Sequence, residues 1–385
     1  MKIGIDARHL TEALSGIPRY MIELTRELAR QGHSEYVLYA PRPPDARPWA
    51  YPSVTLRAAA VRGRAGRFLW SQTTLPWWAW RDGVDVFWGP FRIPRRLPRT
   101  VATVITIHDL VWKYFGETMQ PHRRWIESKL MPAAIRTADR IVAVSSATAQ
   151  AIDAEYPESR GRVRVVHPGA TALAAPAERS SLARFGIDRP HFLFVGTLEP
   201  RKNLPRLLRA YASLDAGARG RAMLVIAGAG GWGKVDIARL VNELNLSRDV
   251  ALTGYISDAD LAALYANARF LAMPSIYEGF GSPIVEAMAF GVPVLTSNSS
   301  SMPEVAGDAA LLVDPLDESA IARGLHTLIL NDERRAELAA RARPNAARFT
   351  WQNAARQMHA VFVEARADRR LPARRTSLQR PLPRQ

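Results

Sequence analysis

The stretch YEGFGSPIVEAMAFGVPV, residues 277–294, places two glutamates eight positions apart around a glycine-rich turn. Ser282 and Pro283 predict the start of a helix, because serine caps helix N-termini and proline loses no intrahelical hydrogen bond at the first helical position. An apolar strand follows the helix. The pattern therefore predicts a loop, helix and strand, with Glu278 in the loop and Glu286 about one turn inside the helix.

Apolar, β-branched runs alternate with amphipathic helical patterns in both directions from this stretch, which is typical of α/β proteins with a mostly parallel sheet. An Ala-, Pro- and Ser-rich segment interrupts the alternation near residue 175, after which it restarts. We therefore expect two doubly wound domains, residues 1–175 and 176–350. The expected strands include KIGID (2–6), EYVLYA (35–40), TVATVITIH (100–108), DRIVAVSS (139–146), RVRVVHPG (162–169), HFLFVG (191–196), AMLVIAGAG (222–230), DVALTGY (249–255), ARFLAMPS (268–275) and VPVLTS (292–297).

The net charge of +16 is unevenly distributed. Residues 1–175 hold 25 Lys and Arg against 15 Asp and Glu, whereas residues 176–363 hold 20 against 19. The last residues, 366–385, are rich in arginine and proline and nearly free of large apolar side chains, so we expect a basic, disordered tail. A basic first half suits an anionic partner such as nucleic acid or a membrane surface, or it is simply a solvated arginine-rich surface.

The chain contains no cysteine, which excludes disulfides, thiolate zinc sites and a cysteine nucleophile. No apolar run is long enough to cross a bilayer, and the start of the sequence lacks the pattern of a signal peptide. We therefore expect a cytoplasmic protein.

Two further stretches match known motifs only in part. GAGGWGKV, residues 228–235, nearly matches a phosphate-binding loop, but Val235 lacks the hydroxyl that holds magnesium, so we interpret the stretch as a glycine-rich turn. SDAD, residues 257–260, has the D-x-D spacing of metal-dependent sugar transferases. It also precedes a helical pattern, and we favour helix capping by Ser257 or Asp258.

Arg201 and Lys202 follow the predicted strand HFLFV and lie side by side at its carboxyl end. Adjacent cations suit a diphosphate, because arginine offers a planar fork and lysine a compact charge. The amides of residues 279–282 and the helix dipole favour an anion, and carboxylates such as Glu278 and Glu286 accept hydrogen bonds from vicinal hydroxyls. Phosphate, ribose and sugar together describe a nucleotide sugar.

The block around the two glutamates resembles the E-x7-E signature of retaining glycosyltransferases of family 4, which have the GT-B fold of two facing Rossmann-like domains with an interdomain cleft. The resemblance extends through FVGTLEPRKN, LTGYISDADLAALYANARFLAMPSIYEGFG and SSSMPEVAGDAALLVDP. In the first half it includes GIDAR, SGIPRY, VITIHDL and RIVAVSS. It covers nearly the whole chain except the tail, and it implies that a last helix, residues 351–365, crosses back to the first domain.

The resemblance also implies roles for individual residues. Glu278 would hold hydroxyls of the donor sugar, Glu286 would bind the ribose, and Arg201 and Lys202 would neutralise the diphosphate. His108 would contact the transferred sugar, so the expected catalytic residues are Glu278, His108, Arg201 and Lys202. The expected donor site adds Gly16, Tyr255, Gly279, Phe280, Gly281 and Glu286, with Ile256 near the base.

These roles imply metal-independent, retaining transfer of a hexosyl unit to a glycan or lipid-linked acceptor, with the nucleotide sugar as substrate and no cofactor. Similarity to mannosyltransferases of surface-polysaccharide and O-antigen assembly favours mannose from GDP-mannose. A UDP-sugar donor, a sugar-nucleotide epimerase and a glycogen-synthase-like enzyme are the alternatives on the same fold. A basic nucleic-acid-binding protein is the alternative outside enzymes, although the chain has no recognised RNA- or DNA-binding motif.

Residues 62–99 mix Trp70, Trp77, Trp78, Trp80 and Trp88 with arginines. Tryptophans beside cations suit a membrane interface or the stacking of sugars. Core packing is the other interpretation, and we favour it for Trp88, which follows an apolar strand. We expect the first domain to dock on an anionic membrane surface.

Overall fold

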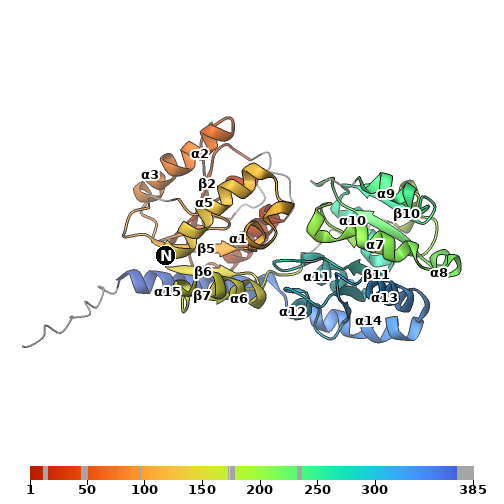
Figure 1. Cartoon of the computed structure of the whole chain (residues 1–385). Coiled ribbons are helices and arrows are strands. Elements are labelled where there is room, and N and C mark those ends of the chain that lie inside the picture. Colours follow the sequence, from red (N-terminus) through yellow and green to blue (C-terminus); the bar gives the residue numbers. More distant parts are fainter. Residues whose placement is uncertain are drawn as a thin grey trace, which may run out of the picture.

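The computed structural model describes residues 1–11, 16–44, 51–94, 97–171, 173, 178–231 and 236–370. The chain forms two α/β halves, each built on one parallel sheet (Figure 1). The two sheets and their covering helices confirm the predicted α/β fold with two Rossmann-like domains.

The first sheet has the order β3-β2-β1-β4-β5-β6-β7, with every neighbouring pair parallel. Its order reverses between β1 and β4, which is where open α/β sheets bind ligands, at the carboxyl ends of the strands. Its strands are β1 (Lys2–Asp6), β2 (Glu35–Ala40), β3 (Val54–Ala58), β4 (Val86–Gly89), β5 (Ala102–Ile107), β6 (Arg140–Ala143) and β7 (Val163–Val165). Its helices are η1 (Arg8–Thr11), α1 (Ile17–Gln31), α2 (Arg64–Gln72), α3 (Thr74–Arg81), α4 (Val111–Tyr114), η2 (Gly116–Thr118), α5 (Pro121–Thr137), α6 (Ser146–Glu155) and η3 (Pro157–Ser159).

The second sheet repeats this pattern with the order β10-β9-β8-β11-β12-β13, again with parallel neighbours. Its order reverses between β8 and β11. Its strands are β8 (His191–Val195), β9 (Met223–Ala227), β10 (Val250–Gly254), β11 (Ala268–Met273), β12 (Val294–Ser297) and β13 (Ala310–Val313). Its helices are η4 (Arg179–Phe185), η5 (Pro200–Lys202), α7 (Leu204–Ala212), α8 (Ala216–Arg221), α9 (Ile237–Glu243), α10 (Asp258–Asn267), α11 (Ser282–Ala289), α12 (Met302–Ala306), α13 (Glu318–Leu330) and α14 (Asp332–Ala346).

The last helix, α15 (Trp351–Arg370), leaves the second half and packs on α1, β5 and β6 of the first (Figure 1). It continues past residue 365, so the prediction that the tail begins at residue 366 is wrong. Ion pairs hold this last turn, from Arg366 to Asp85 at 2.6 Å and from Arg369 to Asp139 at 2.8 Å. Residues 371–385, where the rest of the tail was predicted, lie outside the described residues.

The core explains why the strands are nearly continuous apolar runs, since helices cover both faces of each parallel sheet. Trp88 on β4 is fully buried, and its Nε1 donates to Thr106 at 3.0 Å. Core packing is therefore confirmed for Trp88. Trp70 is also buried, whereas Trp77 and Trp80 on α3 are exposed.

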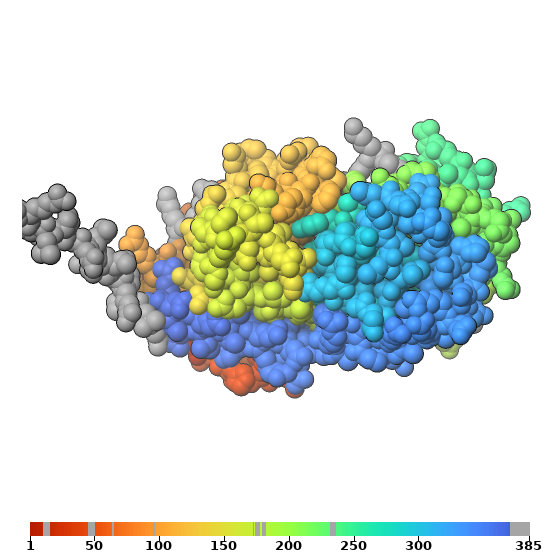
Figure 2. All heavy atoms as spheres, turned by 60° about the horizontal axis from the view of Figure 1, so that its bottom comes forward, coloured from red at the N-terminus to blue at the C-terminus, as the bar shows by residue number. Residues whose placement is uncertain are grey.

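The two halves touch on the face shown in Figure 2, where first-domain residues in yellow meet second-domain residues in cyan, above the blue C-terminal helices. The hydroxyl of Ser145, the N-cap of α6, donates to the carbonyl oxygen of Gly279 at 2.7 Å. Glu304 on α12 accepts from the backbone N–H of Ser146 at 2.9 Å and lies 2.6 Å from Nε2 of His167. The first contact holds the loop before α11 against the first domain, and the other two hold α12 there.

Candidate active site at the domain interface

Arg201, Lys202 and Glu278 form a buried triad at the carboxyl ends of β8 and β11. A terminal guanidinium nitrogen of Arg201 lies 2.7 Å from Oε2 of Glu278, and Nζ of Lys202 lies 2.7 Å from Oε1. The sequence separates the acid from the cations by more than seventy positions. The structure brings them together because η5 and the loop after β11 follow neighbouring strands of one sheet.

The charges of the triad stabilise one another strongly. Burial alone would raise the pKa of Glu278, but Lys202 and Arg201 outweigh it and lower that pKa to about 2. Burial would lower the pKa of Arg201, but Glu278 and Glu199 reverse this and raise it. Glu278 and Arg201 are therefore ionised near neutral pH, and a second carboxylate, Glu199, pairs with Arg201 beside the triad.

Three residues that the sequence analysis did not single out hold this triad in place. Asn203 adopts a left-handed conformation with φ 62°, and its amide nitrogen donates to the carbonyls of Pro274 and Pro315 at 2.9 and 2.7 Å. Glu199 accepts from Nε of Arg201 at 2.9 Å, and Arg201 also donates to the carbonyl of Tyr277 at 3.1 Å. An asparagine directly after a cation pair and before a Leu-Pro helix start was the available signal for such a turn.

The turn before α11 differs from the prediction in one respect. The N-cap is Gly281, with φ 94°, and Ser282 is the first helical residue without a side-chain cap bond. The prediction that Ser282 caps this helix is therefore wrong, since the sharp turn requires a left-handed residue that glycine supplies without strain. The helix N-terminus still follows Glu278 directly, so its dipole favours negative charge near the triad.

His108, at the end of β5, approaches the same turn from the first domain. A Cβ on Gly279 would lie 1.7 Å from the His108 carbonyl oxygen, so only glycine fits there. Burial lowers the pKa of His108, and its Nε2 lies 2.8 Å from the carbonyl of Pro90. A neutral ring with the proton on Nε2 leaves Nδ1 as an acceptor. The Tyr20 ring packs against the His108 ring in a T-shaped arrangement, with 4.8 Å between the ring centroids.

Glu286 belongs to a second group of residues, separate from the triad. It is buried on α11 and accepts a hydrogen bond from the Tyr265 hydroxyl at 3.0 Å, and burial raises its pKa. Arg19 on α1 lies close enough to lower that pKa and pairs with Asp258 of the second domain at 2.6 Å. Glu278 and Glu286 therefore belong to two different hydrogen-bonded groups. Glu278 lies in the loop before α11, and Glu286 lies on the helix itself.

The remaining predicted donor residues surround these two groups. Gly16 is the N-cap of α1 with φ 55°, one turn before Arg19. Tyr255, in the loop after β10, is 65% exposed, whereas Phe280 is buried against His167 and Phe349. Ile256 follows Tyr255 and is partly buried.

The two partial motifs have different outcomes. Ser257 caps α10 by accepting from the Asp260 N–H at 3.1 Å, and Asp260 pairs with Arg184, so capping is confirmed for the SDAD stretch. The near match to a phosphate loop, residues 228–235, falls partly outside the described residues. The structure describes this stretch only as far as residue 231.

This geometry combines two cations, a helix N-terminus and three acceptors at one domain interface. The cations and the helix dipole can stabilise negative charge that develops on a leaving group. The carboxylates of Glu278 and Glu286 and the neutral imidazole of His108 can accept hydrogen bonds from hydroxyl groups. The site is therefore suited to a substrate with an anionic centre and hydroxyls on either side of it.

Comparison with known proteins gives matches over both halves of the chain. Residues 14–171 match the family model Glycosyltransferase Family 4, and residues 181–345 match Glycosyl transferases group 1. O-antigen chain mannosyltransferase B of Escherichia coli is 32% identical over 93% of this chain and 98% of its own length. Among solved structures, sucrose-phosphate synthase from Thermosynechococcus elongatus has a TM-score of 0.76 at 21% identity, covering 96% of this chain and 100% of that one. Anabaena HepE, solved with UDP and glucose, has a TM-score of 0.70 at 17% identity, covering 94% and 99%.

Proposed function

Because this chain belongs to the family 4 glycosyltransferases with the GT-B fold, we propose that it transfers mannose from GDP-mannose to a glycan or lipid-linked acceptor. We propose further that the transfer retains the anomeric configuration and needs no metal ion. The triad of Arg201, Lys202 and Glu278 carries this proposal, because it presents two fixed cations beside a helix N-terminus. The mannosyltransferase name of the relative from Escherichia coli favours mannose as the transferred sugar.

In the proposed reaction, the bond between the anomeric carbon and the diphosphate breaks, and both electrons stay on the phosphate oxygen. Arg201 and Lys202 stabilise that charge in a buried setting, where fixed cations are most effective. The acceptor oxygen attacks the anomeric carbon on the same face, and its proton passes to the departing phosphate. Glu278 orients the two cations and accepts hydrogen bonds from hydroxyls of the sugar, while Glu286 binds the ribose.

The donor and the metal requirement are tested in one assay. We expect mannosyl transfer from GDP-mannose to an acceptor glycan to proceed at an unchanged rate in EDTA, since the charge on the diphosphate is balanced by protein cations. GDP should also raise the melting temperature more than UDP does, because at equal concentration the ligand that binds more tightly stabilises the folded protein more. A ligand at 100 times its Kd stabilises the fold by about 2.7 kcal/mol. The product is analysed by NMR for its anomeric configuration.

Three other outcomes would each contradict a part of this proposal. Activity that is lost in EDTA and restored by manganese would contradict metal independence. Preferred turnover of a UDP-sugar would assign the alternative donor. Conversion or hydrolysis of the donor without any glycosylated product would indicate an epimerase.

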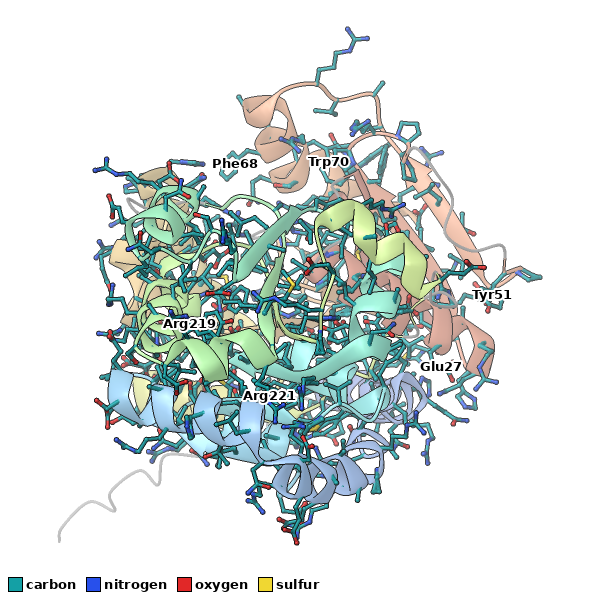
Figure 3. The ribbon with its side chains drawn as sticks, turned by 90° about the vertical axis from the view of Figure 1, so that its right-hand side faces the viewer. Glu27, Tyr51, Phe68, Trp70, Arg219 and Arg221 are labelled. Atoms are coloured by element: carbon teal, nitrogen blue, oxygen red, sulfur yellow. The ribbon has the colours of Figure 1, made fainter. Side chains whose placement is uncertain are left out.

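The first domain carries an exposed apolar surface that supports the proposed membrane docking. Phe68 and Leu69 on α2 are 52% and 63% exposed, and Trp77 and Trp80 on α3 are 49% and 61% exposed. Figure 3 labels Phe68 and Trp70 of α2 in the upper part of the view, and of these two only Phe68 is exposed. The Arg81 guanidinium lies 5.4 Å from the centre of the Trp77 ring, so cations accompany the tryptophans. No helix in the described part of the chain is long and apolar enough to span a bilayer.

We therefore expect the protein to sediment with vesicles rich in anionic lipid, and the double variant Leu69→Ser, Trp80→Ser to bind them at least tenfold more weakly. Burying one such side chain contributes about 1.5–3 kcal/mol, and the attraction of nearby arginines adds to it. The matched control is Leu316→Ser, since Leu316 is 61% exposed on the second domain. An equal loss in the control, or equal binding to neutral vesicles, would contradict docking through α2 and α3.

A further inference from the structure

A cavity of about 260 Å³ lies in the first domain, apart from the triad. It opens between α2, α5 and the segment after β4. Its walls include two arginines and apolar side chains, among them Arg8, Arg92, Phe68, Ile93, Leu130 and Ala133, together with the polar side chains of Ser71, Gln72 and Thr137. Sites for drug-sized ligands occupy roughly 300–1,000 Å³, so this cavity suits a small group rather than a whole nucleotide sugar.

Arg92 is the unusual member of the wall. Its side chain is 21% exposed, and its buried Nε has no hydrogen-bond partner among the described residues. The nearest carboxylate oxygen belongs to Glu127 on α5, at 3.7 Å from the guanidinium, which is too far for a hydrogen bond. A buried guanidinium nitrogen without a hydrogen-bond partner is costly, so Nε of Arg92 is available to bind an anion in the cavity.

The surrounding charges also favour an anion. Arg8 is matched by Asp6, whose two carboxylate oxygens both lie 2.9 Å from its Nε. Glu127 is buried, and burial together with the nearby Asp109 raises its pKa to about 7 against the opposing effects of Arg92 and Arg123. Glu127 is thus partly protonated near neutral pH and only partly balances Arg92.

The apolar part of the wall continues to the protein surface. Phe68 lines the cavity and is 52% exposed, and Leu69 beside it is 63% exposed on the same helix. A free inorganic anion would leave the walls formed by Phe68, Leu130 and Ala133 in contact with water. An anion carried on a hydrocarbon chain would cover them, and its chain could leave the cavity over α2 toward a bilayer.

The cavity also lies near the candidate active site. Asp109 follows His108 directly and is close enough to Glu127 to influence its pKa. Both Arg8 and Arg92 follow strands of the first sheet, after the carboxyl ends of β1 and β4, where its order reverses. A group bound in this cavity therefore lies in the first domain, across the domain interface from the triad of the second domain.

We propose that this cavity binds the phosphate of an amphiphilic acceptor, a phosphate ester carried on a hydrocarbon chain, with Arg92 as its main ligand. This inference rests on the proposed function, because it names the chemical class of the acceptor for the same transfer. Arg92 holds the phosphate through its planar fork, and the chain passes over Phe68 and Leu69. The glycan attached to the phosphate then reaches toward His108 and the donor.

The test measures binding of farnesyl phosphate to the full-length protein by calorimetry at pH 8, with farnesol and inorganic phosphate as separate probes. We expect farnesyl phosphate to bind at least tenfold more tightly than either fragment. Arg92→Gln should weaken its binding about ten- to hundredfold, since a charge-assisted hydrogen bond is lost. Glu127→Gln should strengthen it several-fold, because a competing carboxylate 3.7 Å away is removed.

The opposite signs of the two variants protect the test from a general folding defect, which could only weaken binding. Ala133→Phe, which fills the cavity without changing charge, should also abolish binding. Farnesol binding as tightly as farnesyl phosphate, inorganic phosphate doing the same, or both charge variants shifting in one direction would overturn the proposal. A GDP titration of the same samples reads the donor site separately, so failure of the proposed donor is distinguished from failure of this cavity.

Discussion

Gly279→Ala is expected to reduce mannosyl transfer at least a hundredfold, although the substitution adds a single methyl group. The new Cβ would lie 1.7 Å from the carbonyl oxygen of His108, which is backbone of the other domain and cannot rotate away. The two domains must separate locally to admit the methyl group, and Ser145 then loses its 2.7 Å hydrogen bond to Gly279. A misplacement of about 1 Å at a reacting centre can cost roughly a hundredfold in rate.

The matched control for this variant is Gly220→Ala on α8 of the second domain. Nothing lies within 4 Å of a Cβ at Gly220, so alanine fits there and should leave the rate unchanged. Both variants are compared by kcat with GDP-mannose and by melting temperature. A Gly279→Ala enzyme with a normal kcat would show that the contact with His108 is not needed for transfer.

The fold could be predicted well from the sequence, because this fold follows from local sequence patterns. Parallel strands buried on both faces give apolar runs such as residues 191–195, and amphipathic helices give the three- to four-residue repeat of α1. The tail boundary was wrong because the ion pairs of Arg366 and Arg369 join residues far apart in the chain, which no local composition reveals.

The candidate site was predicted as a set of residues but not as an arrangement. The glycine-rich turn and the cation pair could be recognised because each is local. That Glu278 holds both cations, while Glu286 joins Tyr265 and Arg19, depends on which strands are neighbours in the sheet. The approach of His108 to Gly279 depends in addition on how the two domains pack, and it leaves no mark in the sequence except a glycine.

Glu278→Ala is expected to lower transfer at least a thousandfold while leaving GDP binding intact or tighter. Its carboxylate accepts hydrogen bonds from Arg201 and Lys202 at 2.7 Å each, so its removal leaves two cations that an added diphosphate can neutralise. Arg201→Ala should instead weaken GDP binding, since it removes one of those cations. The two substitutions are separated by GDP calorimetry and by kcat with GDP-mannose, and parallel losses of GDP affinity in both would contradict the proposed division of roles.

The same variant should be less stable near neutral pH, because removing one partner of a buried ion pair costs about 3–5 kcal/mol. The sign of its pH dependence follows from the pKa of Glu278, which is lowered from 4.5 to about 2 in the folded protein. The carboxylate stabilises the fold fully above its unfolded pKa, and this contribution is lost as the pH falls through 2. Urea unfolding should therefore show a difference between the native protein and Glu278→Ala that is largest above pH 5 and shrinks steadily toward pH 2. A difference that stays constant with pH would mean that lost packing, rather than the charges of the triad, destabilises the variant. In that case Glu278→Gln, which keeps the shape of the side chain and removes its charge, would be nearly as stable as the native protein.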